Sequence, residues 1–203
     1  MKKTLKTTLS LLLTLVMILS VGSALAVTAK APAASVTVTT NKGKIRGTRE
    51  NGVNTFKGIP YAKPPVGNRR WKAPVEMSKW SGVKDCTKFG PNAYQKDQST
   101  DETYTKEFVV DTSLGYSEDC LYLNVWSKND QKKKKPIIVY VHGGGFVAGG
   151  SSCEVYDGAN MAKKGAVFVS VNYRLGAMGF YSHPELSAES KDGTSGNYAL
   201  KDI

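Results

Sequence analysis

The sequence predicts an α/β fold, a sheet of buried strands joined by helical crossovers. Two continuous apolar runs, PIIVYV at 136–141 and AVFVSVNY at 166–173, are bounded by turn residues, a pattern typical of strands buried on both faces. Between them, residues 156–164 favour a short helix, with Asp157 as a candidate N-cap. Two buried strands with a helix between them are the repeating unit of an α/β sheet.

The N-terminal segment has the pattern of a secretory signal peptide. Lys2, Lys3 and Lys6 form a basic start, an apolar stretch covers residues 9–21, and the small residues that follow fit a cleavage site after Ala26. A membrane anchor is the alternative interpretation, but the apolar stretch is short for a membrane span. We therefore expect a secreted protein without stable membrane insertion after cleavage.

The remaining elements are predicted in order along the chain. Residues 27–35 are rich in Ala, Pro and Thr and are expected to form a flexible leader before a domain at 36–203. At the start of that domain, the alternating stretch SVTVTT, the turn NKG and the stretch KIRGT predict a β-hairpin. Prolines argue against a regular element at 58–75. The alternating stretch at 121–126 predicts a strand, and 196–203 has the pattern of a helix start.

Composition and charge exclude several classes of function. The 203 residues are 40% hydrophobic and 22% charged, an ordinary globular mixture, and removal of the three signal lysines lowers the formal charge from +11 to +8. Lys132–Lys135 form a basic run without interleaved aromatic residues, so we interpret it as a solvated loop and expect no nucleic-acid partner. The sequence contains no metal-ligand cluster, phosphate-binding loop or nicotinamide fingerprint, so no cofactor is expected. It gives no indication of the oligomeric state.

The stretch HGGGF at 142–146 directly follows the first apolar run. Glycine removes the Cβ and permits positive φ, so a substrate can approach the main chain closely. Two N–H groups that point into one space can stabilise the oxyanion of acyl transfer, and lipases and esterases use an HGGG-type loop in this way. A tight turn that only needs flexible residues is the alternative, but three consecutive glycines between a buried strand and Phe146 favour the catalytic interpretation.

Five stretches in register resemble the type-B carboxylesterase family, which includes cholinesterases and bacterial para-nitrobenzyl esterases. They are FKGIPYAKPPVGNRRW, SEDCLYLNVW, VYVHGGGFVAGG, VSVNYRLGAMGF and GNYALKD, and the likeness runs from about Val36 to Ile203. The resemblance implies an α/β-hydrolase fold, N-terminal portion only, with a small antiparallel sheet and the first strands of the central sheet. It also implies a serine hydrolase that acts on small-molecule carboxylic esters.

The resemblance assigns roles to individual residues. Gly144 and Gly145 match the positions whose N–H groups line the family's oxyanion hole, and Gly143 and His142 match positions that support this loop. Two ion pairs of the family are also matched, and we expect both to fix loop positions rather than to act in catalysis. They are Arg70 with Glu118 near the surface, and Arg174 with Asp202 in the interior.

The chain has three cysteines, Cys86, Cys120 and Cys153. An exported protein can form disulfides, but three cysteines allow at most one, and the sequence itself leaves three pairings open. The resemblance to the family implies a disulfide between Cys86 and Cys120. Cys153 is then an unpaired thiol, which we expect to be inert because no histidine lies near it in the sequence.

The catalytic triad is not found in the chain. The closest approach to a G-x-S-x-G elbow is GTSGN at 193–197, where Asn197 replaces the last glycine and a polar stretch precedes it, so Ser195 is not the expected nucleophile. His142 belongs to the glycine loop, and His183 precedes a proline in a predicted loop. The nucleophile, acid and base of the family are all expected beyond Ile203.

The sequence is thus interpreted as the N-terminal part of an exported carboxylic ester hydrolase that is inactive as given. A non-catalytic, cholinesterase-like binding or adhesion module, or a pseudogene product, is the alternative. Such a chain is expected to leave an open hydrophobic sheet edge next to residues 167–171 and to lack helices over part of one face of its central strands, with low solubility as the consequence.

Overall fold

The computed structural model describes residues 33–97, 107–130 and 134–203. The predicted signal peptide, the first six residues of the predicted leader at 27–35 and the first two residues of the basic run at 132–135 lie outside these ranges. The first strand begins at Ala34, so the end of the predicted leader belongs to the sheet. Within the described ranges, no helix has both the length and the apolar character that a membrane crossing requires.

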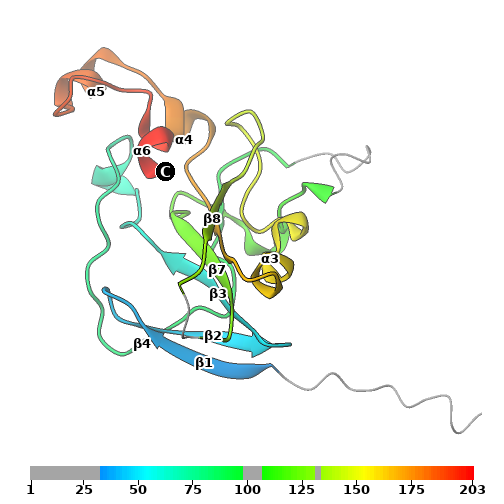
Figure 1. Ribbon diagram of the computed structural model, residues 1–203. Coiled ribbons are helices and arrows are strands. Elements are labelled where there is room, and N and C mark those ends of the chain that lie inside the picture. The colour runs from blue at the N-terminus through cyan, green and yellow to red at the C-terminus, as the bar shows by residue number, and fades with distance from the viewer. Residues whose placement is uncertain (1–32, 98–106, 131–133) are drawn as a thin grey trace, which may run out of the picture. The chain divides into compact units, whose positions relative to one another are not determined.

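A seven-stranded mixed sheet forms the centre of the described residues (Figure 1). Its strands follow the order β1-β2-β3-β7-β9-β8, with β4 added beside β2. Their bounds are β1 (Ala34–Thr39), β2 (Lys44–Glu50), β3 (Val53–Pro60), β4 (Val83–Asp85), β7 (Tyr122–Lys128), β8 (Ile137–Val141) and β9 (Val167–Val171). The short strands β5 (Asn92–Ala93) and β6 (Tyr116–Ser117) form a separate parallel pair.

The helices are short and lie between or after the strands. They are α3 (Ala159–Lys163), α4 (Gly176–Phe180), α5 (Pro184–Glu189) and α6 (Tyr198–Asp202), with 3-10 turns η1 (Gly67–Arg69), η2 (Thr112–Leu114) and η3 (Glu154–Tyr156). In Figure 1, α4, α5 and α6 lie together beyond one end of the sheet, whereas α3 lies beside its strands.

The N-terminal hairpin is confirmed, because β1 and β2 pair antiparallel with Val38 opposite Ile45. The prediction of no regular element at 58–75 is wrong at its first residues. A bulge between Phe56 and Ile59 lets β3 continue to Pro60 while it pairs with β7. Proline is tolerated there because it is the last residue of the strand. Beyond it, η1 is the helical turn of this stretch.

The predicted crossover is present, because β8 and β9 pair parallel and α3 lies between them in the sequence. The helix is shorter than the predicted range 156–164, and its N-cap is Gly158 rather than Asp157. Asp157 still contributes, since its Oδ1 accepts the N–H of Ala159 at 2.8 Å. The packing of α3 on the sheet buries Trp126 and Phe168, whose rings meet edge to face at 6.0 Å.

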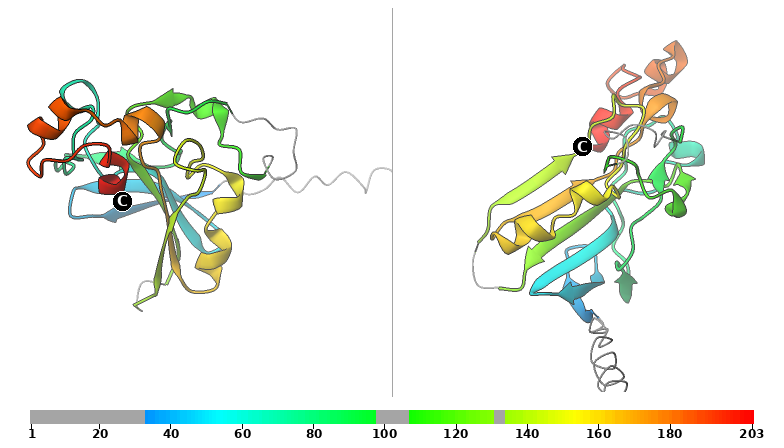
Figure 2. Two further views of the ribbon diagram at one scale, coloured as in Figure 1. Left: turned by 90° about the horizontal axis from the view of Figure 1, so that it is seen from above. Right: turned by 90° about the vertical axis from the view of Figure 1, so that its right-hand side faces the viewer.

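The outer strand of the central sheet is β8, and the expectation of an open edge next to 167–171 is therefore wrong. The strand β9 lies inside the sheet, antiparallel to β7 on one side and parallel to β8 on the other. Figure 2 (right view) shows β8 as the last strand of the row. The reversed order of β8 and β9 could not be read from residue patterns, because both runs are equally apolar.

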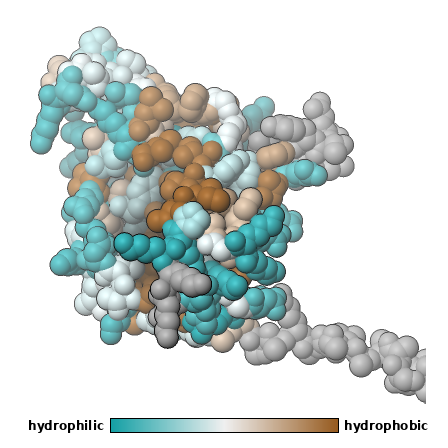
Figure 3. Space-filling model, viewed as in Figure 1, coloured by the Kyte–Doolittle hydropathy of each residue, from teal (hydrophilic) through white to brown (hydrophobic). Residues whose placement is uncertain are grey.

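The predicted burial of β8 on both faces is also wrong. Ile137 is 66% exposed and Val139 is 59% exposed, and Ile138 on the other face of the strand is 39% exposed. Figure 3 shows an apolar area in the middle of the face that it presents. With one neighbouring strand among the described residues, β8 presents an edge of unpaired backbone groups together with apolar side chains.

Substitution of Val139 by lysine should reduce self-association of residues 27–203. A charge on an exposed apolar edge opposes the addition of a strand from another molecule. Sedimentation velocity over a tenfold range of protein concentration measures the association. V139T keeps the branched shape without a charge and serves as the matched control, which should associate like the unmodified chain. Equal association of V139K and V139T would show that the edge is not the cause.

Candidate functional site

The glycine loop begins where β8 ends, at the carboxyl end of the parallel pair β8–β9. Gly144 has φ +124°, and a Cβ on it would lie 1.9 Å from the carbonyl oxygen of Ala148, so no side chain fits there. Gly145 has φ +61° with open space around it, so this position favours glycine because of its backbone conformation and not because a side chain would clash. Ligands of open α/β sheets bind at this end of the strands.

The amides of Gly144 and Gly145 are not used within the described part of the chain. Neither N–H donates a hydrogen bond to a described residue, whereas the Gly144 carbonyl accepts from the N–H of Val147 and Ala148 at 3.2 and 3.1 Å. Residues 143–147 are exposed. The loop thus satisfies its carbonyl internally and leaves two adjacent donors available, which is one requirement for an oxyanion hole.

The loop is held at its far side by two contacts. The Phe146 carbonyl accepts the N–H of Gly176 at 2.8 Å, and its ring packs against Phe180 at 5.1 Å between centroids. Further on, Gly149 exchanges two hydrogen bonds with the side chain of Gln95. No sequence motif marks Gln95, so it was not among the predicted site residues.

His142 supports the loop from below. It is 3% exposed, its ring stacks on Tyr173 with 4.4 Å between centroids, and its Nδ1 lies 2.9 Å from the Gly143 carbonyl oxygen. The Tyr173 hydroxyl donates to the His142 carbonyl at 2.7 Å. Burial lowers the pKa of His142, so the ring is held neutral. A buried, stacked imidazole of this kind positions the loop and is not available to a substrate.

A buried group of amide and hydroxyl side chains lies behind the loop. Asn124 Nδ2 donates to the hydroxyls of Ser151 and Ser170, both at 3.0 Å, and Asn124 Oδ1 accepts the N–H of Gly58. The N–H of Ser151 donates to Asn172 Oδ1 at 2.7 Å. The sequence analysis missed these residues, although Asn124 and Ser170 interrupt strands that are otherwise apolar. That interruption was the available signal, because buried polar groups require partners.

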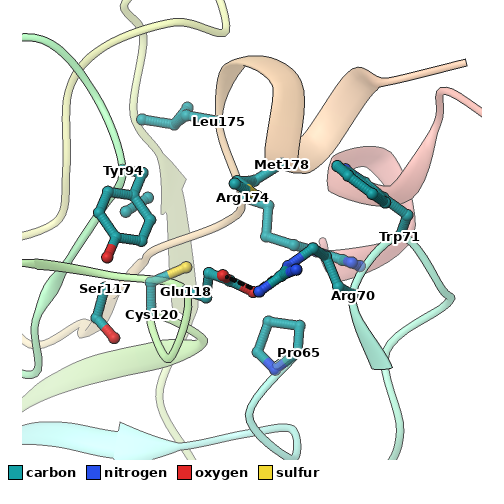
Figure 4. A pocket seen from close by; sticks show the side chains of 11 residues that line it. Pro65, Arg70, Trp71, Tyr94, Ser117, Glu118, Cys120, Arg174, Leu175 and Met178 are labelled. Atoms are coloured by element: carbon teal, nitrogen blue, oxygen red, sulfur yellow. Dashed lines mark hydrogen bonds and ion pairs between the residues drawn. The ribbon is translucent and has the colours of Figure 1, made fainter. Parts of the chain in front are cut away.

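Both ion pairs implied by the family resemblance are present, and Figure 4 shows the one between Arg70 and Glu118. Arg174 binds Asp202 through two side-chain hydrogen bonds of 2.8 and 2.6 Å, and the two side chains are 3% and 0% exposed. Arg70 binds Glu118 in the same forked manner, but its side chain is 41% exposed. The hydrogen bonds that Arg70 donates to Glu118 raise the pKa of Arg70. The first pair fastens α6 to the end of β9, and the second fastens the η1 segment to β6 and β7.

The implied disulfide between Cys86 and Cys120 is absent from the structure, in which all three cysteines are free thiols. The physical reason is that the two side chains belong to different cores. Cys86 packs with Val36, Ile45 and Phe56 near the N-terminal hairpin. Cys120 packs in a separate cluster that includes Ala93, so Ala93 and not Cys86 shares its surroundings.

Cys153 is a buried thiol, which agrees with the expectation that it is inert. It is 2% exposed, and its thiol donates to the carbonyl of Phe108 at 3.1 Å. Burial raises the pKa of Cys153 to about 11, so the thiol stays protonated at neutral pH.

Ser195 lacks the surroundings of a nucleophile. Its Oγ lies 2.7 Å from Ser187 Oγ and 3.2 Å from Ser182 Oγ, and it donates to the carbonyl of His183. No imidazole nitrogen of the described residues is among its hydrogen-bond partners. In the described residues, no group of three or more His, Cys, Asp or Glu could hold a metal ion.

Comparison with known proteins identifies the family. The family model described as "Carboxylesterase family" matches residues 34–203. This chain belongs to the carboxylesterase family. Its fold is accordingly the N-terminal portion of the α/β-hydrolase fold. Two solved structures of PNB esterase superpose on it with TM-scores of 0.69 and 0.66, at 38% and 40% sequence identity. Both superpositions cover 82% of this chain and 32% of the PNB esterase chain.

Curated carboxylesterase relatives agree with this assignment. The chain is 42% identical to the fumonisin B1 esterase of Sphingopyxis macrogoltabida over 81% of its length and 45% identical to the para-nitrobenzyl esterase of Bacillus subtilis over 70%. It is 38% identical to the cholinesterase of Mus musculus over 72%. The matched regions cover 29%, 28% and 25% of these relatives, so the chain spans less than a third of their length.

Acidification should destabilise the chain through His142. Because its pKa is lowered in the folded state, the unfolded state binds the proton first as the pH falls below the ordinary value of about 6.5, and folded stability decreases from there. The slope contributed by one such proton is at most about 1.4 kcal/mol per pH unit. Urea unfolding of H142Q between pH 7.5 and 5 should show a smaller loss than the unmodified chain.

H183Q is the control for this experiment. His183 is the other histidine of the chain, and its side chain is 44% exposed. H183Q should keep the pH dependence of the unmodified chain. An H142Q variant with an unchanged slope would show that the buried imidazole is not responsible.

Removal of Asp202 should be far more destabilising than removal of Glu118. D202N leaves the buried guanidinium of Arg174 without its charged partner, which costs about 3–5 kcal/mol in comparable buried pairs. E118Q affects a pair whose arginine is solvated, so its effect should be much smaller. Equilibrium urea unfolding followed by tryptophan fluorescence compares the two. Equal losses would contradict the difference in burial.

Proposed function

We propose that this chain supplies the oxyanion-binding N-terminal part of an exported serine hydrolase of small-molecule carboxylic esters. The observation that carries the proposal is the pair of unused amides at Gly144 and Gly145, presented at the end of a parallel strand in a member of the carboxylesterase family. The names of the relatives, fumonisin B1 esterase and para-nitrobenzyl esterase, support ester hydrolysis. The signal-peptide pattern ending at Ala26 supports export.

In the proposed reaction, a serine oxygen attacks the ester carbonyl carbon, and the carbonyl oxygen takes the negative charge. The N–H groups of Gly144 and Gly145 donate to that oxygen, and a base transfers the serine proton to the departing alcohol. Water then releases the acid from the acyl enzyme. The nucleophile, the acid and the base are assigned to segments beyond Ile203. Within the chain, neutral His142 and the two ion pairs hold the loop and its neighbours in position.

The chain as given is proposed to be inactive. Its amides lie in an exposed loop, and Ser195 has no imidazole partner in the described residues. Hydrogen bonds to a developing charge accelerate a reaction when they are aligned in a site that excludes water, and this loop is open to it. Residues 27–203 should therefore hydrolyse para-nitrophenyl acetate no faster than their S195A variant.

A hybrid enzyme tests the function directly. Residues 34–203 are joined to the C-terminal remainder of the Bacillus subtilis para-nitrobenzyl esterase, and hydrolysis of para-nitrophenyl acetate is measured. We expect turnover. In the hybrid, G145V should lower kcat by about 100- to 1000-fold with little change in KM, because the donor at this position is displaced.

G52V is the matched control, since Gly52 also has positive φ and open space around it but lies in the β2–β3 turn. It should retain the kcat of the parent hybrid. An unchanged kcat in G145V would refute the oxyanion role. A hybrid with native-like circular dichroism and no turnover would favour the non-catalytic binding module.

A further inference from the structure

We propose that Gln95 is a positioning residue for the oxyanion loop, an inference that rests on the proposed esterase function. Its side-chain amide forms hydrogen bonds with both the N–H and the carbonyl of Gly149, at the C-terminal end of the loop. Gln95 Oε1 accepts the N–H of Gly149 at 2.8 Å, and Gln95 Nε2 donates to the carbonyl of Gly149 at 2.8 Å. The same Nε2 lies 3.2 Å from the carbonyl oxygen of Ala93 in β5. One side chain thus fixes Gly149 to the β5 segment.

Gly149 is the residue through which this contact reaches the base of the oxyanion loop. It is buried and has φ +101°. A Cβ on Gly149 would lie 2.5 Å from the carbonyl oxygen of Gly143 and 2.7 Å from Nδ1 of His142. The Gly149 backbone therefore packs directly against the two residues that precede Gly144, and a displacement of Gly149 changes the packing of both.

The other contacts of the loop do not replace Gln95. The Phe146 carbonyl is held by Gly176 on the opposite side, and the N–H of Ser151 is held by Asn172 two residues further along the chain. Without Gln95, the N–H and the carbonyl of Gly149 both lose their hydrogen-bond partners in a buried position. A buried unpaired backbone group is costly, so the loop would move until these groups reach water. That movement would misalign the amides of Gly144 and Gly145.

The first experiment uses nuclear magnetic resonance on residues 27–203 labelled with 15N-glycine, and it requires no activity. Q95M replaces the amide by an unbranched side chain of similar length that forms neither hydrogen bond. The amide resonances of Gly144, Gly145 and Gly149 should shift, and exchange of the Gly149 amide with solvent should accelerate at least tenfold. K96M, on the adjacent exposed residue, is the control and should change none of them. Unchanged Gly144 and Gly145 resonances in Q95M would overturn the proposal.

The second experiment measures kinetics in the hybrid enzyme. Q95M should lower kcat about 10- to 100-fold, the cost of a small misplacement of catalytic groups, with KM within twofold of the parent. Affinity for a trifluoromethyl ketone, which forms a tetrahedral oxyanion, should fall in parallel, and K96M should match the parent. Rates are expressed per active site titrated with an organophosphate, so partial unfolding does not imitate the effect. An active hybrid in which Q95M keeps its kcat would refute the role of Gln95, whereas a folded, inactive parent hybrid would refute the proposed function instead.

Discussion

The close approach of the Gly144 backbone to the Ala148 carbonyl is the constraint on which the rest of the site depends. No Cβ fits at Gly144, and its own carbonyl accepts two amides from residues 147 and 148. The turn therefore closes on itself with its carbonyl satisfied, and the N–H groups of Gly144 and Gly145 are left as donors. A turn with the same glycines in another conformation could direct carbonyl oxygens outward instead, and these would repel an oxyanion. The proposed oxyanion binding thus depends on which backbone groups form hydrogen bonds within the turn and which remain available.

Contacts with surrounding residues hold the glycine turn in this conformation. His142 and Tyr173 stack beneath it, Gln95 binds Gly149, and the Gly176 amide binds Phe146. These partners come from the segments that follow β5 and β9 and from the start of α4, so the loop is bound to segments that are distant in the sequence. The buried pair of Arg174 and Asp202 secures the last of these segments, since it joins Arg174, which lies between β9 and α4, to α6. Forked arginine–carboxylate geometry gives orientation as well as energy, which suits a positioning role.

Residue patterns predicted the local elements well and the long-range arrangement poorly. The hairpin of β1 and β2, the parallel pair around α3 and the two ion pairs follow from alternation, apolar runs and family motifs. The edge position of β8 did not, because strand order depends on pairing between segments of equal hydrophobicity. The disulfide implied by the family resemblance is not formed. Cys86 and Cys120 were paired on the resemblance alone, and their side chains lie in different hydrophobic clusters. Gln95 was not predictable at all, since its role exists only where the fold brings β5 to the loop.

In this site, the conformation of the glycine loop and the strength with which its amides would stabilise an oxyanion depend on different features of the fold. Contacts within residues 33–203 hold the glycine loop and leave the N–H groups of Gly144 and Gly145 without a partner among the described residues. Their effect on a reaction depends on something else, namely the exclusion of water from a loop that is exposed here. In water, an amide donor binds the ester carbonyl of the ground state, or a water molecule, almost as well as it binds the oxyanion. Equal binding of the ground state and the transition state does not accelerate the reaction. An oxyanion hole therefore needs two contributions from the fold, one that orients the amides and one that covers them. In the proposed enzyme, this chain would supply the first.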